Sequence, residues 1–466
     1  MAASRALRLS LWILLSLLVL TALAGLALLL VNRHDEPISE SALKFTLMCQ
    51  SRPPVEDAQN AYVYALGFAA AREDDPRSIG IDRMAQINAA LQQPGKGLHA
   101  LVAPEQTLTL QRPPALRNLL SECRLMGPRC DDALDARIDV VRQWLADEAW
   151  LLDRHRALLA NSDWLEPRPV EGRAAPASTQ LMSVMPAHEV LLAQAWVHAR
   201  DGKPEAARAL LEADHRFWRM VLANTESLTT KSIAATALKR HFQYANLAMR
   251  KLSPVQTAAF IPAGWQQPIS EEERSMTWAL IGEWLYANTS LDLSRRDAVD
   301  EDAAQRNLAG QIQHAFASRL FKYQATSNQI AEQYMDVALA LDRPIAETAD
   351  AMASVQALQS KAQGLKTPWY GMAYNPIGKI LTAIGHSRID RYATNVANLE
   401  GLRRASLLAA RLRATSDDVE QARQALNTPD LFNPYSTGPM EWRPAERMVA
   451  FVGLTSGDQE IHSFSY

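Results

Sequence analysis

The sequence predicts a mostly α protein with an N-terminal transmembrane helix, a large exported α-helical domain and a short C-terminal β segment. Residues 11–31 form an apolar run without a charged side chain. Good helix formers, chiefly Ala, Leu, Arg, Glu and Gln, dominate the body of the chain. Beyond Pro429, short aromatic and β-branched segments are separated by Gly and Pro, which is typical of short strands.

Length and composition narrow the class of protein. The 466 residues suffice for two or three domains or for one extended helical array. Hydrophobic residues make up 48% of the chain, charged residues 21%, and the formal net charge is -3. These values argue against global disorder and against a strongly basic nucleic-acid-binding protein, so we expect no nucleic-acid partner.

The apolar run from Leu11 to Val31 is the strongest local signal in the chain. About 20 consecutive apolar residues are what an α-helix needs to cross the hydrocarbon core of a bilayer. Arg5 and Arg8 precede the run, and a basic leader favours a cytoplasmic N-terminus. We therefore expect a single-pass protein of the bacterial inner membrane, anchored through residues 11–31, with the bulk of the chain in the periplasm.

A cleaved signal peptide is the alternative to this anchor. Ala22-Leu23-Ala24 has the small-residue pattern of a cleavage site. The apolar run continues past that point from Leu26 to Val31, which favours an uncleaved signal anchor. Lipoprotein processing is disfavoured because Cys49 lies beyond the run and follows a bulky residue.

Proline residues and helix-capping pairs divide the remaining chain into segments. The segment after the anchor contains the pair Pro53-Pro54 and lacks a clear apolar period, so we interpret it as a tether. Further on, Ser270 and Glu273 form a capping-box pair that predicts a helix start. The predicted organisation is residues 1–32 as leader and transmembrane helix, 33–60 as tether, 61–427 as α-helical periplasmic domain and 428–466 as β-rich segment.

Two cysteines suit an oxidising compartment. Cys123 and Cys130 flank the turn-forming Gly127-Pro128, and such a pair commonly closes a disulfide in an exported protein. A ring of this size stabilises the fold by about 2.5 kcal/mol in the chain-entropy model. A metal site would require additional Cys or His ligands nearby, and none is present in this stretch. We expect a disulfide and no metal, and the state of Cys49 stays open.

A metalloprotease motif is also incomplete. His188-Glu189 begins an H-E sequence, but Leu192 stands where the second histidine of HExxH is required. We interpret these residues as polar groups on a solvated or packed helix face and expect neither a metal nor another cofactor.

Residues Leu191 to Leu222 form the clearest local pattern, a helix, an Asp201-Gly202 turn and a second helix that begins near Pro204. This stretch is similar to a tetratricopeptide-type helical hairpin, and Ser406 to Leu426 repeats the pattern. The resemblance implies a helical-hairpin or solenoid-like fold whose family members mostly bind partners. The overall layout resembles that of uncharacterised exported, membrane-anchored proteins of Gram-negative bacteria.

The stretch from Ala373 to Gly378, "AYNPIG", resembles the "AYNAG" segment of lytic transglycosylases. That resemblance implies a catalytic glutamate that protonates a glycosidic oxygen, usually followed by serine. Glu226-Ser227 is the local match, while the "GLMQ"-like loop of the family is missing. The alternative interpretation is a corner between two helices, in which Pro376 biases Asn375 toward an extended conformation.

The same region predicts a binding surface. Aromatic side chains precede a helix whose outer face carries arginines, a combination that suits an acidic partner or a glycan. A surface helix beside a core is the simpler interpretation, and the pair Glu400 and Arg404 offsets part of the positive charge. The candidate surface consists of Trp369, Tyr370, Tyr374, Asn375, Lys379, Arg388, Arg391 and Arg404.

Taken together, these patterns favour a protein without enzymatic activity. We expect a membrane-anchored periplasmic scaffold, adaptor or inhibitor that binds another envelope protein, of which a toxin immunity protein is one concrete form. A peptidoglycan-acting envelope enzyme such as a lytic transglycosylase is the alternative.

Overall fold

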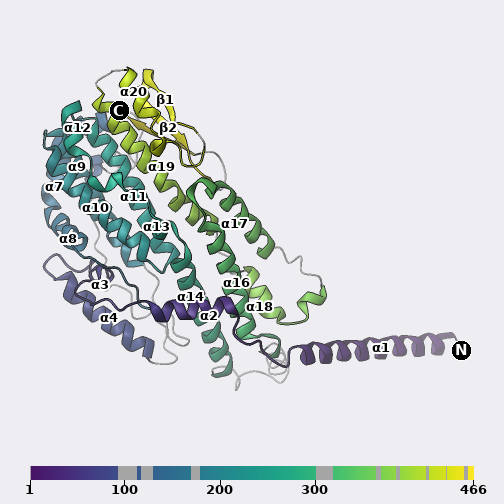
Figure 1. Cartoon of the computed structure of the whole chain (residues 1–466). Coiled ribbons are helices and arrows are strands. Elements are labelled where there is room, and N and C mark those ends of the chain that lie inside the picture. Colours follow the sequence, from purple (N-terminus) through teal and green to yellow (C-terminus); the bar gives the residue numbers. More distant parts are fainter. Residues whose placement is uncertain are drawn as a thin grey trace. The chain divides into compact units, whose positions relative to one another are not determined.

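A computed structural model shows a chain built mostly from α-helices, as the sequence predicts (Figure 1). It divides into two compact units. Unit 1 comprises Met1–Arg52, Trp284–Asp336 and Gln356–Ser387, and unit 2 comprises Pro53–Glu283, Val337–Val355 and Arg388–Tyr466. The structure describes residues 2–92, 113–116, 130–168, 179–300, 318–363, 369–384, 389–415, 419–436, 438–455 and 460–466.

Helix α1 (Ala2–Val31) contains the predicted apolar run. Its portion Ser10–Val31 is long and apolar enough to cross a membrane, and its large apolar side chains are exposed. The candidate transmembrane helix is therefore confirmed as a helix of suitable length and composition. The periplasmic location of the rest of the chain stays a prediction.

The segment interpreted as a tether, residues 33–60, contains one helix, which the prediction does not include. Helix α2 (Glu40–Ser51) begins where the Ser39 hydroxyl accepts a hydrogen bond from the Ala42 backbone N. Ala42 and Phe45 are fully buried, and the Phe45 ring packs edge-on against Trp284 at 5.6 Å. Since α2 buries only these two side chains, its sequence carries no clear apolar period.

The remaining elements of unit 1 lie in helices beyond residue 283. They are parts of α14 (Thr277–Asp300), α16 (Tyr323–Leu341) and α17 (Thr348–Gln363), together with the short η5 (Trp369–Met372) and α18 (Pro376–Ile384). Asp35, just after α1, caps the start of α16 because its carboxylate accepts hydrogen bonds from the backbone N of Gln324 and Ala325, at 2.9 and 3.0 Å. The chain is thus fixed to α16 as it leaves α1.

Unit 2 contains the predicted helical hairpin. Helices α9 (Met185–Arg200) and α10 (Pro204–Asn224) pack against each other, and the turn between them places Gly202 at φ +70°, which favours glycine. Helices α11 (Leu228–Met249) and α19 (Ile389–Ala414) pack together beside them. The helices of the hairpin are confirmed, whereas a solenoid-like arrangement stays a prediction.

The other helices of unit 2 range from the four residues of α13 (Glu271–Arg274) to the 17 residues of α4 (Pro76–Gln92). Helix α13 starts with the predicted capping box, in which Ser270 and Glu273 satisfy each other's backbone N. The set is α3 (Ala61–Leu66), α4 (Pro76–Gln92), α6 (Cys130–Asp135), α7 (Ile138–Asp147), α8 (Ala149–Leu159), α12 (Pro254–Phe260), α13 (Glu271–Arg274) and α20 (Val419–Leu426), with the 3-10 turns η2 (Thr179–Ser183), η3 (Ala263–Gln266), η4 (Ile345–Glu347), η6 (Pro429–Leu431) and η7 (Pro444–Glu446).

Three short strands follow in the segment where the sequence predicts them. Strands β1 (Glu441–Arg443), β2 (Met448–Val452) and β3 (Ile461–Ser465) form an antiparallel sheet in that order. One face of β2 and β3 packs on α19, where Phe451 and Phe464 are buried. The alternation of buried and exposed residues along β3 places His462 on the same inner face.

Candidate functional site

An aspartate and two histidines meet in the core of unit 2. The Asp214 carboxylate accepts hydrogen bonds from His241 Nδ1 at 2.9 Å and Trp218 Nε1 at 3.0 Å. His188 Nε2 lies 3.2 Å from the same carboxylate. Trp265 Nε1 donates to His241 Nε2 at 2.9 Å, and because an indole only donates, His241 is neutral with its proton on Nδ1.

The composition of this cluster resembles that of an acid–base catalytic site, but solvent cannot reach it. Asp214, His188 and His241 have fully buried side chains. Burial raises the pKa of Asp214, but the electrostatic interaction with His188 and the hydrogen bonds from both histidines outweigh this effect and hold the pKa well below its usual range. A carboxylate that stays ionised out of reach of solvent stabilises the fold and has no access to a substrate. Within the described residues, no group of three or more His, Cys, Asp or Glu is placed to hold a metal ion.

Glu226, the glutamate of the transglycosylase alternative, is held in an ion pair. Arg168 donates from Nε and Nη2 to the two carboxylate oxygens of Glu226, at 2.7 and 2.6 Å, and the Glu226 side chain is only 4% exposed. Its backbone N donates to the buried Glu166 carboxylate at 2.7 Å. This bidentate pairing fixes Glu226 inside the fold, and it gives no support to a role as an acid at a glycosidic bond.

Asn375 of the predicted binding surface is a buried corner residue. Its side-chain oxygen accepts hydrogen bonds from the backbone N of Lys322 and Gly378, and its amide nitrogen donates to Thr326 Oγ1 at 2.9 Å. Its φ of +50° is left-handed, not extended as Pro376 predicts. Asparagine tolerates this conformation better than most residues, and the side-chain hydrogen bonds outweigh the local bias.

Lys379 and Tyr374 lie beside this corner. Lys379 Nζ donates to the carbonyls of Gly371 and Tyr374, at 2.6 and 2.8 Å. Burial lowers the pKa of Lys379, an effect that the charge of Glu36 opposes. Tyr374 Oη donates to the His34 carbonyl at 3.3 Å. Tyr374 therefore links the corner to the chain just after α1, whereas the hydrogen bonds of Lys379 stay within residues 371–379.

The other predicted surface residues are spread along the chain. Trp369 and Tyr370 lie in η5, and Arg388 lies outside the described residues. Arg391 is exposed on α19. Arg404 Nε donates to Glu400 at 2.7 Å, which confirms the predicted pair.

The predicted surface is divided between the two units. Unit 1 contains Tyr374, Asn375 and Lys379, whereas unit 2 contains Arg391 and Arg404.

The predicted disulfide falls partly outside the described residues. Cys130 begins α6 and is buried. Cys123 lies beyond the described part of the chain, so the Cys123–Cys130 bond stays a prediction.

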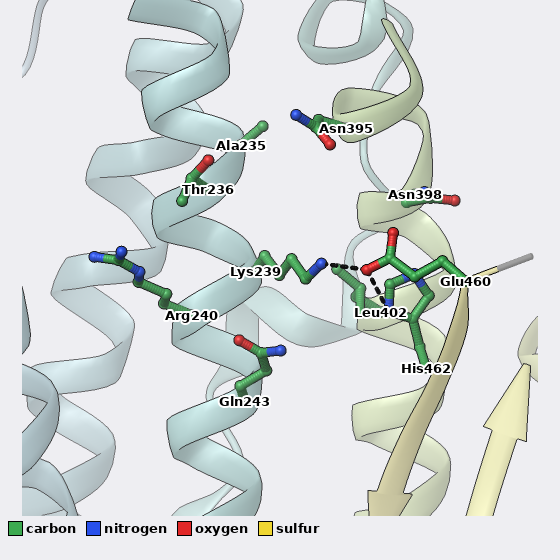
Figure 2. Close-up of a pocket in the computed structure, with 10 residues that line it drawn as sticks. All are labelled: Ala235, Thr236, Lys239, Arg240, Gln243, Asn395, Asn398, Leu402, Glu460 and His462. Atoms are coloured by element: carbon green, nitrogen blue, oxygen red, sulfur yellow. Dashed lines mark hydrogen bonds and ion pairs between the residues drawn. The ribbon is translucent and has the colours of Figure 1, made fainter. Parts of the chain in front are cut away.

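A polar pocket of about 240 Å³ opens in unit 2 (Figure 2). Helices α11 and α19 form two of its sides, and the start of β3 forms the third. Its lining combines cations, an anion and amides. The residues are Ala235, Thr236, Lys239, Arg240, Gln243, Asn395, Asn398, Leu402, Glu460 and His462.

An ion pair crosses this pocket, and Figure 2 shows Lys239 reaching from α11 toward Glu460. Lys239 Nζ lies 2.6 Å from Glu460 Oε1, and the side chains remain 36% and 47% exposed. Burial raises the pKa of Glu460, but the hydrogen bond from Lys239 and the neighbouring charges lower it below its usual range. The pocket therefore holds a charged pair that is still accessible to solvent.

His462 forms the inner wall of the pocket. Its ring stacks on Phe451 with centroids 4.9 Å apart, and burial lowers its pKa to about 4 although Glu460 acts in the opposite direction. The ring is therefore neutral at neutral pH. Its Nε2 has no hydrogen-bond partner in the part of the chain that the structure describes, and a Cβ on Gly453 would lie 2.8 Å from it.

Asn398 supports the pocket from α19. Its side-chain amide donates to the Leu454 carbonyl at 2.9 Å and accepts from the Leu454 backbone N at 2.8 Å. This pairing fixes the chain beyond β2 against α19. The pocket has no local sequence signal: alternation along β3 places His462 inward, but no motif links this residue to α11.

Comparison of the chain with models of protein families, with curated proteins and with solved structures finds no match.

Proposed function

We propose that this protein is anchored in the inner membrane through α1 and that its exported helical part binds another envelope protein, acting as a scaffold, adaptor or inhibitor. The observation that carries the proposal is the polar pocket of Figure 2. It offers a charged pair and side-chain amides, groups that hydrogen-bond to the backbone and to charged side chains of a polypeptide.

The size of the pocket supports a protein partner over a small substrate. Its volume of about 240 Å³ is below the roughly 300–1,000 Å³ typical of small-molecule sites. A pocket of this size suits one or two side chains that project from a partner's surface. Polar residues and ion pairs are common at the rims of such interfaces.

The ion pair itself contributes little to the fold. Exposed pairs stabilise proteins by about 0–1 kcal/mol, because solvent screens the charges and both side chains lose freedom. Lys239 and Glu460 are both partly exposed, so their charges can interact with charged groups of a partner and orient it. Complementary charges chiefly set the rate and the specificity of association.

Co-purification tests the proposal. Tagged full-length protein is isolated from detergent-solubilised native membranes as wild type, Lys239→Glu or Glu460→Lys. The matched control is Arg443→Glu, which reverses one charge of the exposed pair with Glu441 in the same unit. We expect an envelope protein with the wild type and the control, and its loss with both pocket variants. Equal recovery from all four proteins, or no partner together with degradation of cell-wall sacculi, would contradict the proposal.

A reporter fused after Tyr466 tests the location. We expect activity from a reporter that functions only in the periplasm. Activity from a reporter that functions only in the cytoplasm would overturn the orientation.

A further inference from the structure

Helix α18 is amphipathic in the reverse sense of a soluble surface helix. Gly378 and Thr382 are buried, whereas Ile380 and Leu381 are 42% and 43% exposed. Ile377, three and four residues before these two, lies on the same face. A surface helix of a soluble protein normally turns its apolar face toward the core and its polar face toward solvent.

Close backbone packing explains why the polar side of α18 faces inward. A Cβ on Gly378 would lie 2.0 Å from Thr326 Oγ1, so only glycine allows the approach to α16. Thr382 Oγ1 donates to the Gly378 carbonyl at 2.8 Å, which satisfies the buried hydroxyl. The orientation of α18 is therefore fixed, and the exposed stripe is a consequence of it.

The start of α18 is attached to the end of α1. Asn32 directly follows the apolar run of α1, and its side-chain oxygen accepts a hydrogen bond from the backbone N of Asn375 at 2.7 Å. Its amide nitrogen donates to the carbonyls of Ala373 and Leu28, at 2.7 and 2.8 Å. Asn375 immediately precedes α18. Within unit 1, α18 thus begins where the candidate transmembrane helix ends.

This attachment keeps the apolar stripe close to a membrane surface. With a rise of about 1.5 Å per residue, Ile380 and Leu381 lie roughly 7–9 Å along the helix from Asn375. The polar region of a bilayer adds about 5–8 Å on each side of the hydrocarbon core. The stripe is therefore within reach of the lipid headgroups whenever α1 spans the membrane.

We propose that α18 lies on the bilayer that α1 spans and inserts Ile377, Ile380 and Leu381 among the phospholipids. The inference rests on the proposed membrane anchoring of α1. The apolar stripe lies on the helix that begins where the apolar run of α1 ends, so phospholipid is the partner that its position and chemistry favour. The two contacts, joined through Asn32 and Asn375, fix the orientation of unit 1 on the membrane.

Photo-crosslinking of the full chain in phospholipid nanodiscs tests this contact. A benzophenone amino acid replaces Leu381 in one variant, Leu20 within α1 in a second and Val419, which is 55% exposed on α20, in a third. Mass spectrometry then detects phospholipid adducts. We expect adducts from positions 20 and 381 and at least a tenfold lower yield from position 419.

The crosslinks at positions 20 and 381 test the membrane anchor and the α18 contact separately. An adduct at 20 without one at 381, or equal yields at 381 and 419, overturns the α18 contact and leaves the anchor intact. No adduct at 20 overturns the anchor and the α18 contact together. A protein adduct at 381 in native membranes, in place of lipid, identifies the stripe as a protein-binding surface and also overturns the proposal. Since Leu381 is exposed, Leu381→Asp keeps the fold, and we expect it to reduce the lipid adduct of a crosslinker at Ile377 several-fold.

Discussion

Replacing Asp214 by asparagine is expected to destabilise unit 2 strongly. The two carboxylate oxygens accept hydrogen bonds from N–H groups that cannot act as acceptors. Trp218 Nε1 only donates, and His241 Nδ1 carries the ring proton because Nε2 accepts from Trp265. In Asp214→Asn, the new amide nitrogen faces one of these N–H groups whichever way the side chain is turned.

The size of the effect follows from those contacts. Hydrogen bonds to a charged group contribute about 1.5–3 kcal/mol each, and a buried donor left without an acceptor costs about 1–3 kcal/mol. Loss of one such bond, with one buried donor left unsatisfied, therefore destabilises the fold by about 2.5–6 kcal/mol. The cluster is fully buried, so solvent cannot replace the lost acceptor.

Denaturant unfolding of the full chain in detergent, followed by tryptophan fluorescence, measures this loss. Asp139→Asn is the matched control because Asp139 is exposed on α7 and should change stability by less than about 0.5 kcal/mol. Since the pKa of Asp214 is lowered in the fold, its contribution is present above its ordinary pKa of 3.8 and declines as the pH falls below that value. A loss of less than about 1 kcal/mol in Asp214→Asn would refute the reasoning.

Three further predictions concern packing and buried titratable groups. Gly282→Ala should cost about 3 kcal/mol or more in unfolding free energy because its Cβ would lie 1.6 Å from the Glu226 carbonyl, whereas Gly438→Ala, with open space around it, should be nearly neutral; equal thermal midpoints would contradict this. His155→Leu should raise the unfolding free energy by about 1 kcal/mol because both ring nitrogens are buried without a hydrogen-bond partner among the described residues. Burial lowers the pKa of His155 to about 3, so the variant should also lose less stability as the pH falls from 6.5 toward 3, and an unchanged acid titration would count against it. Burial lowers the pKa of Lys231 to about 7, so the unfolded chain takes up a proton between pH 7 and 10.5 and stability rises across that window; a rise of the same size in Lys231→Met would exclude this lysine as its cause.

Local sequence signals account for the features that were predicted correctly. The apolar run of α1, the turn at Gly202 and the capping box at Ser270 each depend on residues a few positions apart. Aromatic and β-branched residues between turn residues likewise indicate the strands beyond Pro429. Such signals determine the type of an element, and tertiary contacts are not needed to recognise them.

Contacts between distant residues explain what the sequence did not reveal. The pocket joins Lys239 on α11 to Glu460, which is more than two hundred positions later, so no periodic pattern links them. Asn375 adopts its left-handed conformation with the help of Asn32, a residue near the other end of the chain. Helix α2 is likewise fixed by a few contacts, such as that between Phe45 and Trp284.

Crosslinking from the pocket tests the proposed partner binding most directly. A photoreactive amino acid replaces Gln243, which lines the pocket, and in a control it replaces Val255, which is 84% exposed on α12. After irradiation of native membranes, we expect one discrete adduct with an envelope protein from position 243 and none from position 255. The same adducts from both positions, or no protein adduct from position 243, would contradict the account.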